Sequence, residues 1–326
     1  MHPGRISAGV FALGFAGVAL IGSDSGIAAG GWPQRAVTLI VPFGSGAGPD
    51  IAARIYAEQL SVRWKQPIVV ENRAGAEGLI GVAAFAAMHD DHALLFSPAA
   101  PISVYPFTQE KLAYDPSRDL VPISSAASSF GVIAATASMN VRSIAEFVRV
   151  GRAEPGKFNW GSGGGAFPIL FSGFLKTTGL DLARISYRQQ NLAIQDLAQG
   201  RIQVFASTLT ALLPMAQAGK IHLLAVTNGT RAPIAPDVPT AIEAGYPELE
   251  FDGLTGFFGW RDMPPELRDR IAADVRAVAA DASVAERLAK AGQIVHAGTP
   301  AEFGREIDEQ RSRISGIVRL LGKIEP

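Results

Sequence analysis

The sequence predicts an α/β protein built from two lobes. Short apolar runs typical of strands alternate with segments of helical period, a pattern typical of α/β layers with mostly parallel sheets. The chain has 326 residues, more than one hydrophobic core usually serves. Two apolar, β-prone stretches without helical period, residues 120–135 and 254–260, are suited to act as crossover strands between the lobes.

The expected elements follow from local patterns. Apolar runs predict strands at residues 37–41, 68–71, 93–97, 158–161, 185–187, 202–206, 223–226 and 294–296. Helical period predicts helices at residues 49–64, 191–198, 265–280 and 283–291. Two capping-box sequences, beginning at Ser143 and Thr299, predict two more helices, the last of which should reach about residue 321.

The domain organisation follows from the two crossover stretches. If the chain leaves the first domain at one stretch and returns at the other, the block between them is an inserted domain. Lobe 1 is then residues 30–125 together with 257–326, and lobe 2 is residues 126–256. No internal repeat and no low-complexity linker interrupts this arrangement.

The first residues predict a secretory signal peptide, residues 1–29. Arg5 precedes an apolar run, residues 6–22, and small residues near Ala28 or Ala29 provide a cleavage site. The run is short for a helix that must cross ~30 Å of hydrocarbon. No second segment is long and apolar enough to span a membrane, so we expect an exported, soluble mature chain.

Composition excludes several classes of function. The net charge of −1 provides no basic surface for nucleic acid, and no cluster of Lys or Arg indicates a membrane surface. The absence of cysteine excludes disulfides, thiol catalysis and zinc–thiolate or iron–sulfur sites. Residues 89–92, His-Asp-Asp-His, are the only cluster with metal-ligating side chains, and we interpret them as a solvated turn. We therefore expect no metal and no cofactor.

The sequence does not match the residue spacing of known hydrolase or nucleotide-binding motifs. Gly161-Ser162-Gly163 is not the Gly-x-Ser-x-Gly of a nucleophile elbow. The glycine-rich loop from Gly44 to Gly48 lacks the Gly-Lys-Ser/Thr of a phosphate loop and the Gly-x-Gly-x-x-Gly of a dinucleotide site. We therefore expect no catalytic residue and no enzymatic activity.

What remains is a pair of anion-binding loops. The loop from Gly44 to Gly48 and the loop from Gly161 to Gly165 each follow a predicted strand and precede a helix. Glycines let backbone N–H groups turn toward one point, and a helix N-terminus adds partial positive charge. The alternative is a tight turn without a ligand. In facing lobes the two loops would direct their donors into one cleft, which strand ends at Ser97, Tyr187 and Ser207 would also border.

These stretches occur within a longer resemblance. The segments "WPQRAVTLIVPFGSGAGPDIAARIYAEQL", "QPIVVENRAGAEGLIGVAAFA", "LAYDPSRDLVPIS" and "LLAVTNGTRAPIAPDVPTAIEAGYPE" occur in order across essentially the whole mature chain. They resemble the Bug-type family, the substrate-binding proteins of tripartite tricarboxylate transporters. The resemblance implies a two-lobed periplasmic binding fold, type II-like, that captures a small organic carboxylate.

The same resemblance implies the partners and leaves alternatives open. The expected partners are the organic acid and the membrane permease subunits of such a transporter, with the binding protein a monomer in the periplasm. A ligand-sensing module that passes its bound state to a membrane sensor kinase is one alternative. An exported enzyme on the same fold is another, and it would require a titratable pair in the cleft.

The resemblance also assigns ligand-binding residues. They are Phe43, Gly44, Ser45, Gly46, Ala47, Gly48 and Asp50 in the first loop, Ser97, Pro98 and Ala99 in the next first-lobe turn, Ser162, Gly163, Gly164, Gly165 and Phe167 in the second-lobe loop, and Tyr187, Ser207 and Thr208. Asp50 can equally be a helix N-terminal residue. We expect Arg73 to form a scaffold salt bridge, and Arg188 is a candidate for either role.

Departures from the family pattern concern the ligand. Gly44 and Ser45 replace two prolines, which predicts a looser first loop. Ser207 stands where an acid is common, and this argues against an amino-acid ligand. Phe43, Trp160 and Phe167 predict a less polar pocket, suited to an aromatic or alkyl carboxylate.

Overall fold

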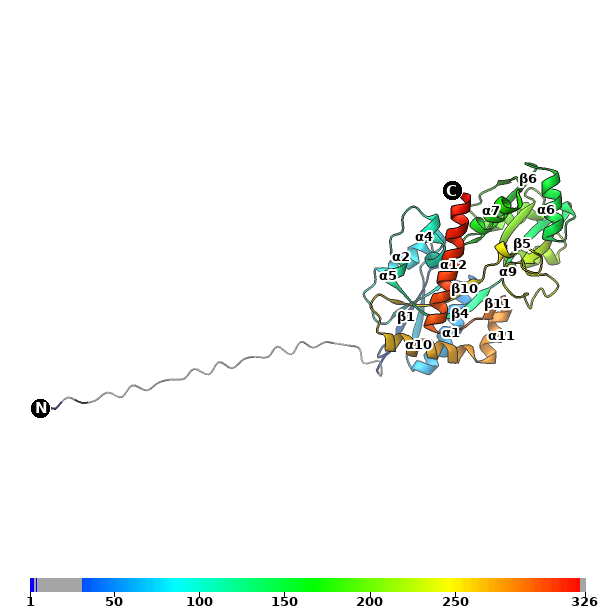
Figure 1. Ribbon diagram of the computed structural model, residues 1–326. Helices are drawn as coiled ribbons and strands as arrows, with labels where there is room; N and C mark the ends of the chain where they lie inside the picture. The colour runs from blue at the N-terminus through cyan, green and yellow to red at the C-terminus, as the bar shows by residue number, and fades with distance from the viewer. Residues whose placement is uncertain (3, 5–30, 323–326) are drawn as a thin grey trace.

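The computed structural model describes residues 1, 2, 4 and 31–322, so nearly all of the expected signal peptide lies outside the described residues. Figure 1 shows two α/β bodies, with the long C-terminal helix running alongside both of them. The expected two-lobed α/β fold is confirmed. Within the described part of the chain, no helix combines the length and the hydropathy of a membrane span.

The strands have the following bounds: β1 Val37–Val41, β2 Ile68–Asn72, β3 Ala93–Pro98, β4 Leu120–Ser129, β5 Gly131–Thr136, β6 Phe158–Ser162, β7 Leu182–Arg184, β8 Val204–Thr208, β9 Ile221–Val226, β10 Gly253–Trp260 and β11 Gln293–Val295. The α-helices are α1 Gly48–Trp64, α2 Leu79–Ala86, α3 Ala100–Ser103, α4 Tyr105–Thr108, α5 Pro116–Asp119, α6 Ile144–Ala153, α7 Phe167–Thr178, α8 Gln190–Ala198, α9 Leu209–Gln217, α10 Pro265–Ala279, α11 Ala282–Lys290 and α12 Pro300–Leu321. Short 3-10 turns are η1 Ala76–Gly78, η2 Ala137–Met139 and η3 Pro247–Leu249.

Each lobe is organised around one mixed sheet. The first sheet has the order β11-β4-β10-β3-β1-β2, and the second has the order β7-β6-β8-β5-β9. In the first sheet β1 is parallel to β2 and β3, whereas β10 is antiparallel to both β3 and β4. In the second sheet β6 is parallel to β7 and β8, whereas β5 is antiparallel to β8 and β9. The expectation of mostly parallel sheets is therefore wrong, because the crossover strands enter each sheet in the reverse direction.

The chain passes between the sheets at two places. Only Phe130 separates β4 of the first sheet from β5 of the second, and residues 227–252 lead back from β9 to β10. The predicted lobe boundaries at residues 125/126 and 256/257 stay a prediction, and both cuts fall inside strands of the first sheet. We propose that the boundaries lie at Phe130 and within residues 227–252.

The predicted helices and strands mostly coincide with the observed ones. The strand predicted at residues 185–187 is an exception. A strand was expected at residues 185–187, but β7 ends at Arg184. This edge strand pairs with β6 only through residues 182–184, and Ile185 lies past the end of the sheet with 38% of its surface exposed. The apolar character of Ile185 therefore does not mark a buried strand.

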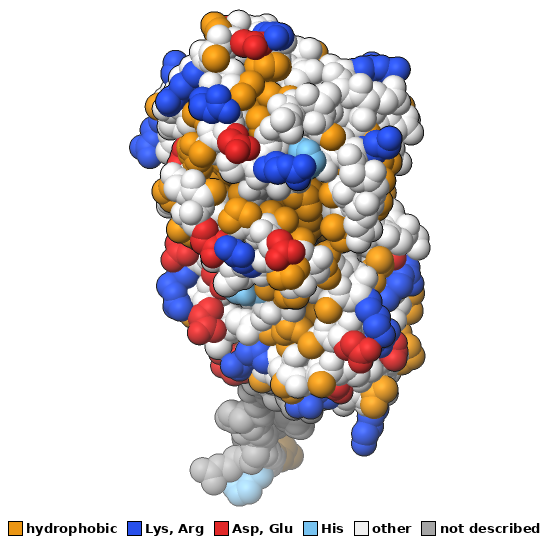
Figure 2. Space-filling view, turned by 90° about the vertical axis from the view of Figure 1, so that its right-hand side faces the viewer, with side chains coloured by type: hydrophobic (Ala, Val, Ile, Leu, Met, Phe, Trp, Pro, Cys, Tyr) orange, Lys and Arg blue, Asp and Glu red, His pale blue; other side chains and the backbone are white. Residues whose placement is uncertain are grey.

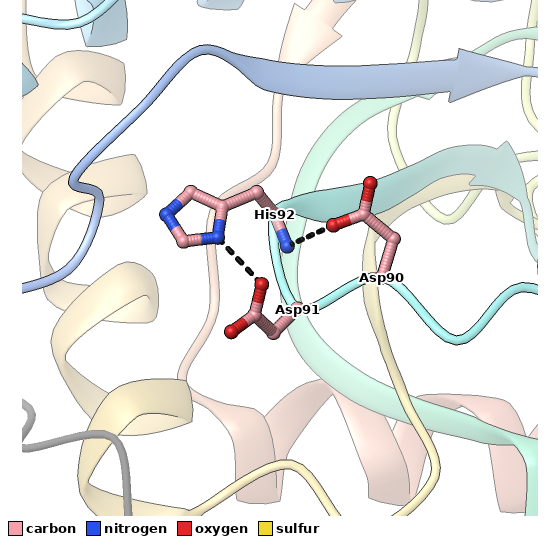
Figure 3. Close-up of side chains that lie close together, drawn as sticks. All are labelled: Asp90, Asp91 and His92. Atoms are coloured by element: carbon pink, nitrogen blue, oxygen red, sulfur yellow. Dashed lines mark hydrogen bonds and ion pairs between the residues drawn. The ribbon is translucent and has the colours of Figure 1, made fainter.

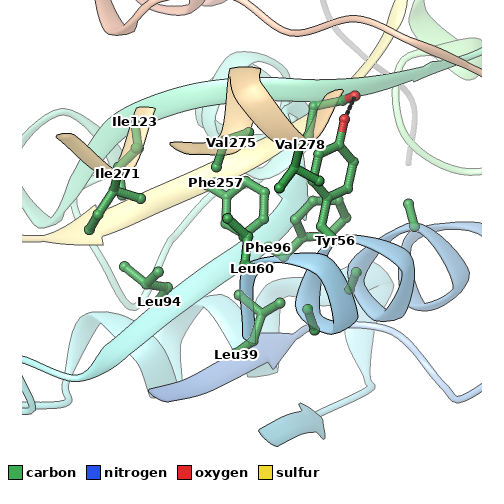
Figure 4. Packing of buried hydrophobic residues seen from close by; sticks show 14 of the residues in the cluster. Leu39, Tyr56, Leu60, Leu94, Phe96, Ile123, Phe257, Ile271, Val275 and Val278 are labelled. Carbon is green, nitrogen blue, oxygen red and sulfur yellow. Dashed lines mark hydrogen bonds between the residues drawn. The ribbon is translucent and has the colours of Figure 1, made fainter. Parts of the chain in front are cut away.

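The core of the first lobe is aromatic and close-packed. Figure 4 shows Tyr56 of α1, Phe96 of β3 and Phe257 of β10 packed together in this core. The rings of Phe96 and Phe257 meet edge to face, with centroids 4.9 Å apart. The buried Tyr56 hydroxyl donates a hydrogen bond to the Ala126 carbonyl at 2.6 Å, which fixes α1 to crossover strand β4.

A separate apolar cluster joins the lobes. It combines Tyr105 of α4 in the first lobe with Leu170 of α7 in the second lobe and Ile314 of α12, and all three side chains are buried. Helix α12 begins against the first lobe and packs along α7, as Figure 1 shows. A Cβ added at Gly173 of α7 would lie 2.7 Å from Ile317 Cγ2 of α12, so the glycine allows this close approach. Helix α12 is thus a third connection between the lobes.

This packing makes a testable prediction from two glycines in helices. Gly316→Ala of α12 should raise the free energy of unfolding by up to ~1 kcal/mol, because its Cβ would meet nothing within 4 Å. Gly173→Ala should lose that gain, because overpacking against Ile317 costs about 1–3 kcal/mol. Urea denaturation of both variants measures the difference. Equal stabilisation by the two substitutions would contradict close α7–α12 packing.

Candidate functional site

A cleft of about 380 Å³ lies where residues of the two lobes meet. Phe43 and Pro98 line its first-lobe side, and Phe167 and Thr208 line its second-lobe side. The returning crossover segment contributes Phe251 and the residues that follow it. On the face drawn in Figure 2, basic and acidic side chains are interspersed, and apolar side chains gather across the middle.

Several helices present their N-termini to the cleft. The N-terminal residues of α1, α3, α4, α7, α8 and α9 line it, among them Gly48, Gln190 and Thr210. Ala291, at the C-terminal end of α11, lines it as well. The first N–H groups of a helix have no partner within the helix and carry partial positive charge. Among the described residues that line the cleft, the only charged side chains are two acids, Glu77 and Asp252. Positive potential in this cleft therefore comes from backbone dipoles.

The first glycine loop is closed by its own acid. The Asp50 carboxylate accepts hydrogen bonds from the Gly46 N–H at 2.8 Å, from Asn72 Nδ2 at 2.8 Å and from Arg54 Nε at 3.0 Å. Asp50 is 1% exposed and does not line the cleft. Burial acts to raise its pKa, but the bonds from Arg54, Gly46 and Asn72 outweigh burial and lower the pKa. These contacts place Asp50 to hold the loop.

The second glycine loop meets an acid of the opposite lobe. Glu77, in η1 of the first lobe, accepts a hydrogen bond from the Gly165 N–H at 3.3 Å. The same oxygen, Glu77 Oε2, accepts one from the Tyr105 hydroxyl at 2.9 Å. Burial and then the nearby Glu77 charge raise the pKa of Tyr105, so the tyrosine remains a donor at neutral pH. A second N–H of this loop, that of Gly163, donates to the Ala206 carbonyl.

The structure brings about half of the sequence-predicted site residues to the cleft. Those that line it are Phe43, Gly48, Pro98, Ala99, Gly164, Gly165, Phe167, Ser207 and Thr208. Those that do not are Gly44, Ser45, Gly46, Ala47, Asp50, Ser97, Ser162, Gly163 and Tyr187. The role of each as a ligand contact stays a prediction.

A second hollow of about 240 Å³ adjoins the cleft. Ser162, Tyr187 and Arg188 line it, and it shares Glu77 and Gly164 with the main cleft. The Tyr187 hydroxyl donates to Asp196 at 2.8 Å. Burial, followed by this contact with Asp196, raises the pKa of Tyr187 to about 12. Arg188 thus borders the neighbouring hollow and not the main cleft.

The contacts of Arg73 and Trp160 test two further expectations. Arg73 forms an ion pair with Glu71 at 2.7 Å, as expected for a scaffold residue. Trp160 was expected to make the pocket less polar, but it is 2% exposed and belongs to the second-lobe core beside Phe171. That expectation is wrong. Successive side chains of a strand point to opposite faces of the sheet, and the Trp160 side chain lies on the face that packs into the second-lobe core.

Several cleft residues carry no signal in their local sequence. Glu77 lies in a tight turn distant in sequence from both loops, Asp252 precedes β10, Gln293 begins β11 and Gln310 lies within α12. Gln293 Nε2 donates to the Gly48 carbonyl at 3.0 Å, and Gln310 Nε2 donates to the Asp252 carbonyl at 2.9 Å. Only the tertiary fold brings these residues together.

A buried amide connects the two crossover segments beneath the cleft. Asn228 Nδ2 donates to the Asp252 carboxylate at 2.8 Å and to the Ser129 carbonyl at 3.1 Å, while Asn228 Oδ1 accepts from the Gly131 N–H. Burial raises the pKa of Asp252, and the bond from Asn228 opposes this shift. The place where the chain changes lobe is therefore cross-linked by one side chain.

In the His-Asp-Asp-His turn, residues 89–92, the second histidine is held by hydrogen bonds. Figure 3 shows His92 Nδ1 facing Asp91 at 2.7 Å, while the His92 backbone N–H donates to Asp90 at 2.9 Å. The other ring nitrogen, Nε2, accepts from the Gln34 N–H, and Arg35 pairs with both acids. His92 is 6% exposed, so the expectation of a solvated turn is wrong for this residue. The contacts fasten residues 34–35 to the start of β3.

Comparisons with known proteins agree on one family. The family model described as "Tripartite tricarboxylate transporter family receptor" matches residues 52–323. Protein BugT of Bordetella pertussis is 28% identical over 309 residues, covering 94% of this chain and 95% of BugT. The periplasmic binding protein BugD has a solved structure with 25% identity and a TM-score of 0.74, covering 89% of this chain and 99% of that one. A structure of an R. palustris protein with adipate has 28% identity and a TM-score of 0.78, covering 89% and 98%.

The contacts of Asp50 predict a stability change that depends on pH. Asp50→Asn should lower the free energy of unfolding at neutral pH by about 1.5–3 kcal/mol, because hydrogen bonds to a charged, buried acceptor are lost. The folded-state pKa is lowered, so this contribution is present above the unfolded value of about 3.9 and is lost as pH falls through the folded value. Denaturant unfolding at several pH values measures it. The exposed Asp237→Asn is the control, and a loss equal in both variants would contradict the role of Asp50.

Proposed function

Because the chain belongs to the tripartite tricarboxylate transporter receptor family, we propose that it captures a small organic carboxylate between its lobes and delivers it to the permease subunits of such a transporter. The relatives include a periplasmic binding protein and a structure with a bound dicarboxylate. With residues 1–29 as a cleaved signal peptide, the mature chain would work in the periplasm. Its role is reversible binding, without catalysis.

The observation that carries this proposal is a cleft that is lined by helix N-termini and hydroxyls and by no cation among the described residues. A desolvated carboxylate needs several hydrogen bonds, and N–H groups at helix N-termini supply them. The N-termini of α1 and α9 face the cleft from opposite lobes. The hydroxyls of Thr208 and Thr210 make no hydrogen bond within the described part of the chain, so they are suited to donate to the ligand.

The rest of the ligand meets apolar side chains. Phe43, Phe167, Phe251 and Leu254 line the cleft from both lobes and from the crossover segment. Burying alkyl or aromatic surface against them stabilises the complex by about 25 cal/mol per Å² of apolar area removed from water. An aromatic or alkyl carboxylate therefore fits this cleft better than a small polar acid does.

Closure would bend the chain at the two crossover segments. Phe130 and residues 227–252 are the only covalent passages between the sheets in residues 31–322, and Asn228 cross-links them. Helix α12 adds a non-covalent connection, so its packing on α7 limits how far the lobes separate. The closed form would be the state that the permease recognises. A sensor kinase as the receiver is the alternative, and genes for permease subunits or for a kinase beside this gene distinguish the two.

Binding should depend on the carboxylate and on the Thr208 hydroxyl. Titration calorimetry with aliphatic and aromatic carboxylates should show binding, and the corresponding primary amides should not bind. Thr208→Val should weaken binding about 5–10-fold, since one hydrogen bond contributes about 1 kcal/mol and this hydroxyl does not cap α9. The exposed Thr230→Val is the matched control. Equal binding of acids and amides, or turnover of a bound ligand, would overturn the proposal.

A further inference from the structure

We propose that Glu77 makes this cleft selective for monocarboxylates, because its side chain occupies the place at the second-lobe loop where a second ligand carboxylate would bind. The inference rests on the proposed function and specifies the class of ligand. It follows from the contacts of Glu77, from the charges around the cleft and from the hollow beyond it.

The Glu77 carboxylate lies directly on the second-lobe glycine loop. Besides its bond to the Gly165 N–H, it is so close to Gly164 that a Cβ added there would lie 2.6–2.8 Å from its carboxyl carbon and both oxygens. Gly165 comes just before α7, so the acid sits at the positive end of that helix. A carboxylate of the protein thus already accepts from the Gly165 N–H, a donor that a ligand carboxylate at this loop would need.

Contacts within the first lobe hold Glu77 in this position. The buried Tyr105 hydroxyl donates to Glu77 Oε2 and also approaches the Glu77 carbonyl, at 3.3 Å. The Glu77 backbone has φ of 54°, in the left-handed region that L side chains rarely adopt. The side chain is therefore positioned by its own lobe before it meets Gly165.

The charges around the cleft fit one ligand carboxylate. Among the helix N-termini that line the cleft, which include those of α1, α7, α8 and α9, the one at α7 already faces Glu77. The other acid, Asp252, adds a second negative group, and no Lys or Arg among the described lining residues offsets either acid. A dicarboxylate would place its second charge beside a fixed like charge with no compensating cation.

Glu77 also separates the cleft from basic side chains. Arg184 and Arg188 line the neighbouring hollow, and Glu77, Gly164 and Gln190 form the wall that the hollow shares with the cleft. A longer diacid could reach these arginines only by passing the Glu77 carboxylate. Replacing the acid with a neutral side chain should therefore open both the α7 N-terminus and this region to a second carboxylate.

The test compares monoacids and diacids of equal length on two proteins. Titration calorimetry with hexanoate and adipate, and with benzoate and terephthalate, gives an affinity ratio for wild type and for Glu77→Gln. We expect the wild type to favour the monoacid at least about tenfold, and Glu77→Gln to reduce that ratio by about tenfold. Glu110→Gln removes an exposed acid outside the cleft and should leave the ratio unchanged.

The outcomes separate this inference from the proposed function. A wild type that binds the diacid as tightly as its matched monoacid, or a ratio that Glu77→Gln does not change, overturns the role of Glu77 and leaves carboxylate capture standing. An equal change in Glu110→Gln also overturns it, because the effect would then reflect net charge alone. If neither protein binds any acid of the panel, the proposed function fails, and the selectivity of Glu77 fails with it.

Discussion

Under the proposed function, the constraint on which the site depends is that a carboxylate must be held without a cation. The cleft between the lobes is lined by helix N-termini, hydroxyls, amides and aromatic rings, and its charged lining residues within the described chain are acids. Hydrogen bonds from fixed backbone donors can replace the hydration of one carboxylate. Such donors must be positioned by the fold, and this explains why the crossover segments and α12 are fastened so closely to both lobes.

The same constraint explains how the two glycine loops are used. Each loop has a backbone N–H that donates to a carboxylate of the protein: Gly46 donates to Asp50 and Gly165 donates to Glu77. Asp50 is buried and fixes the shape of its loop, whereas Glu77 is exposed and lies in the cleft wall. The two loops resemble each other in sequence, but the acids bonded to them have different proposed roles. Asp50 supports the shape of its loop, and Glu77 is proposed to select among ligands.

The sequence predicts local features well and contacts between lobes poorly. The boundaries of β1, α1, α10 and α12 follow from patterns of neighbouring residues, and both glycine loops were located because strand, loop and helix are adjacent in the chain. Trp160 and Ile185 were misplaced, because facing and pairing in a sheet depend on partner strands. Glu77 and Gln310 could not be assigned to the cleft, because their neighbours there are distant in sequence.

The most direct test of the account is a crystal structure of the protein purified with its natural ligand. We expect a single carboxylate at the N-termini of α1 and α9, near Gly48 and Thr208, with Glu77 still bonded to Gly165. A ligand carboxylate seated on Gly164 and Gly165 with Glu77 displaced would contradict this account. So would a carboxylate paired with Arg188.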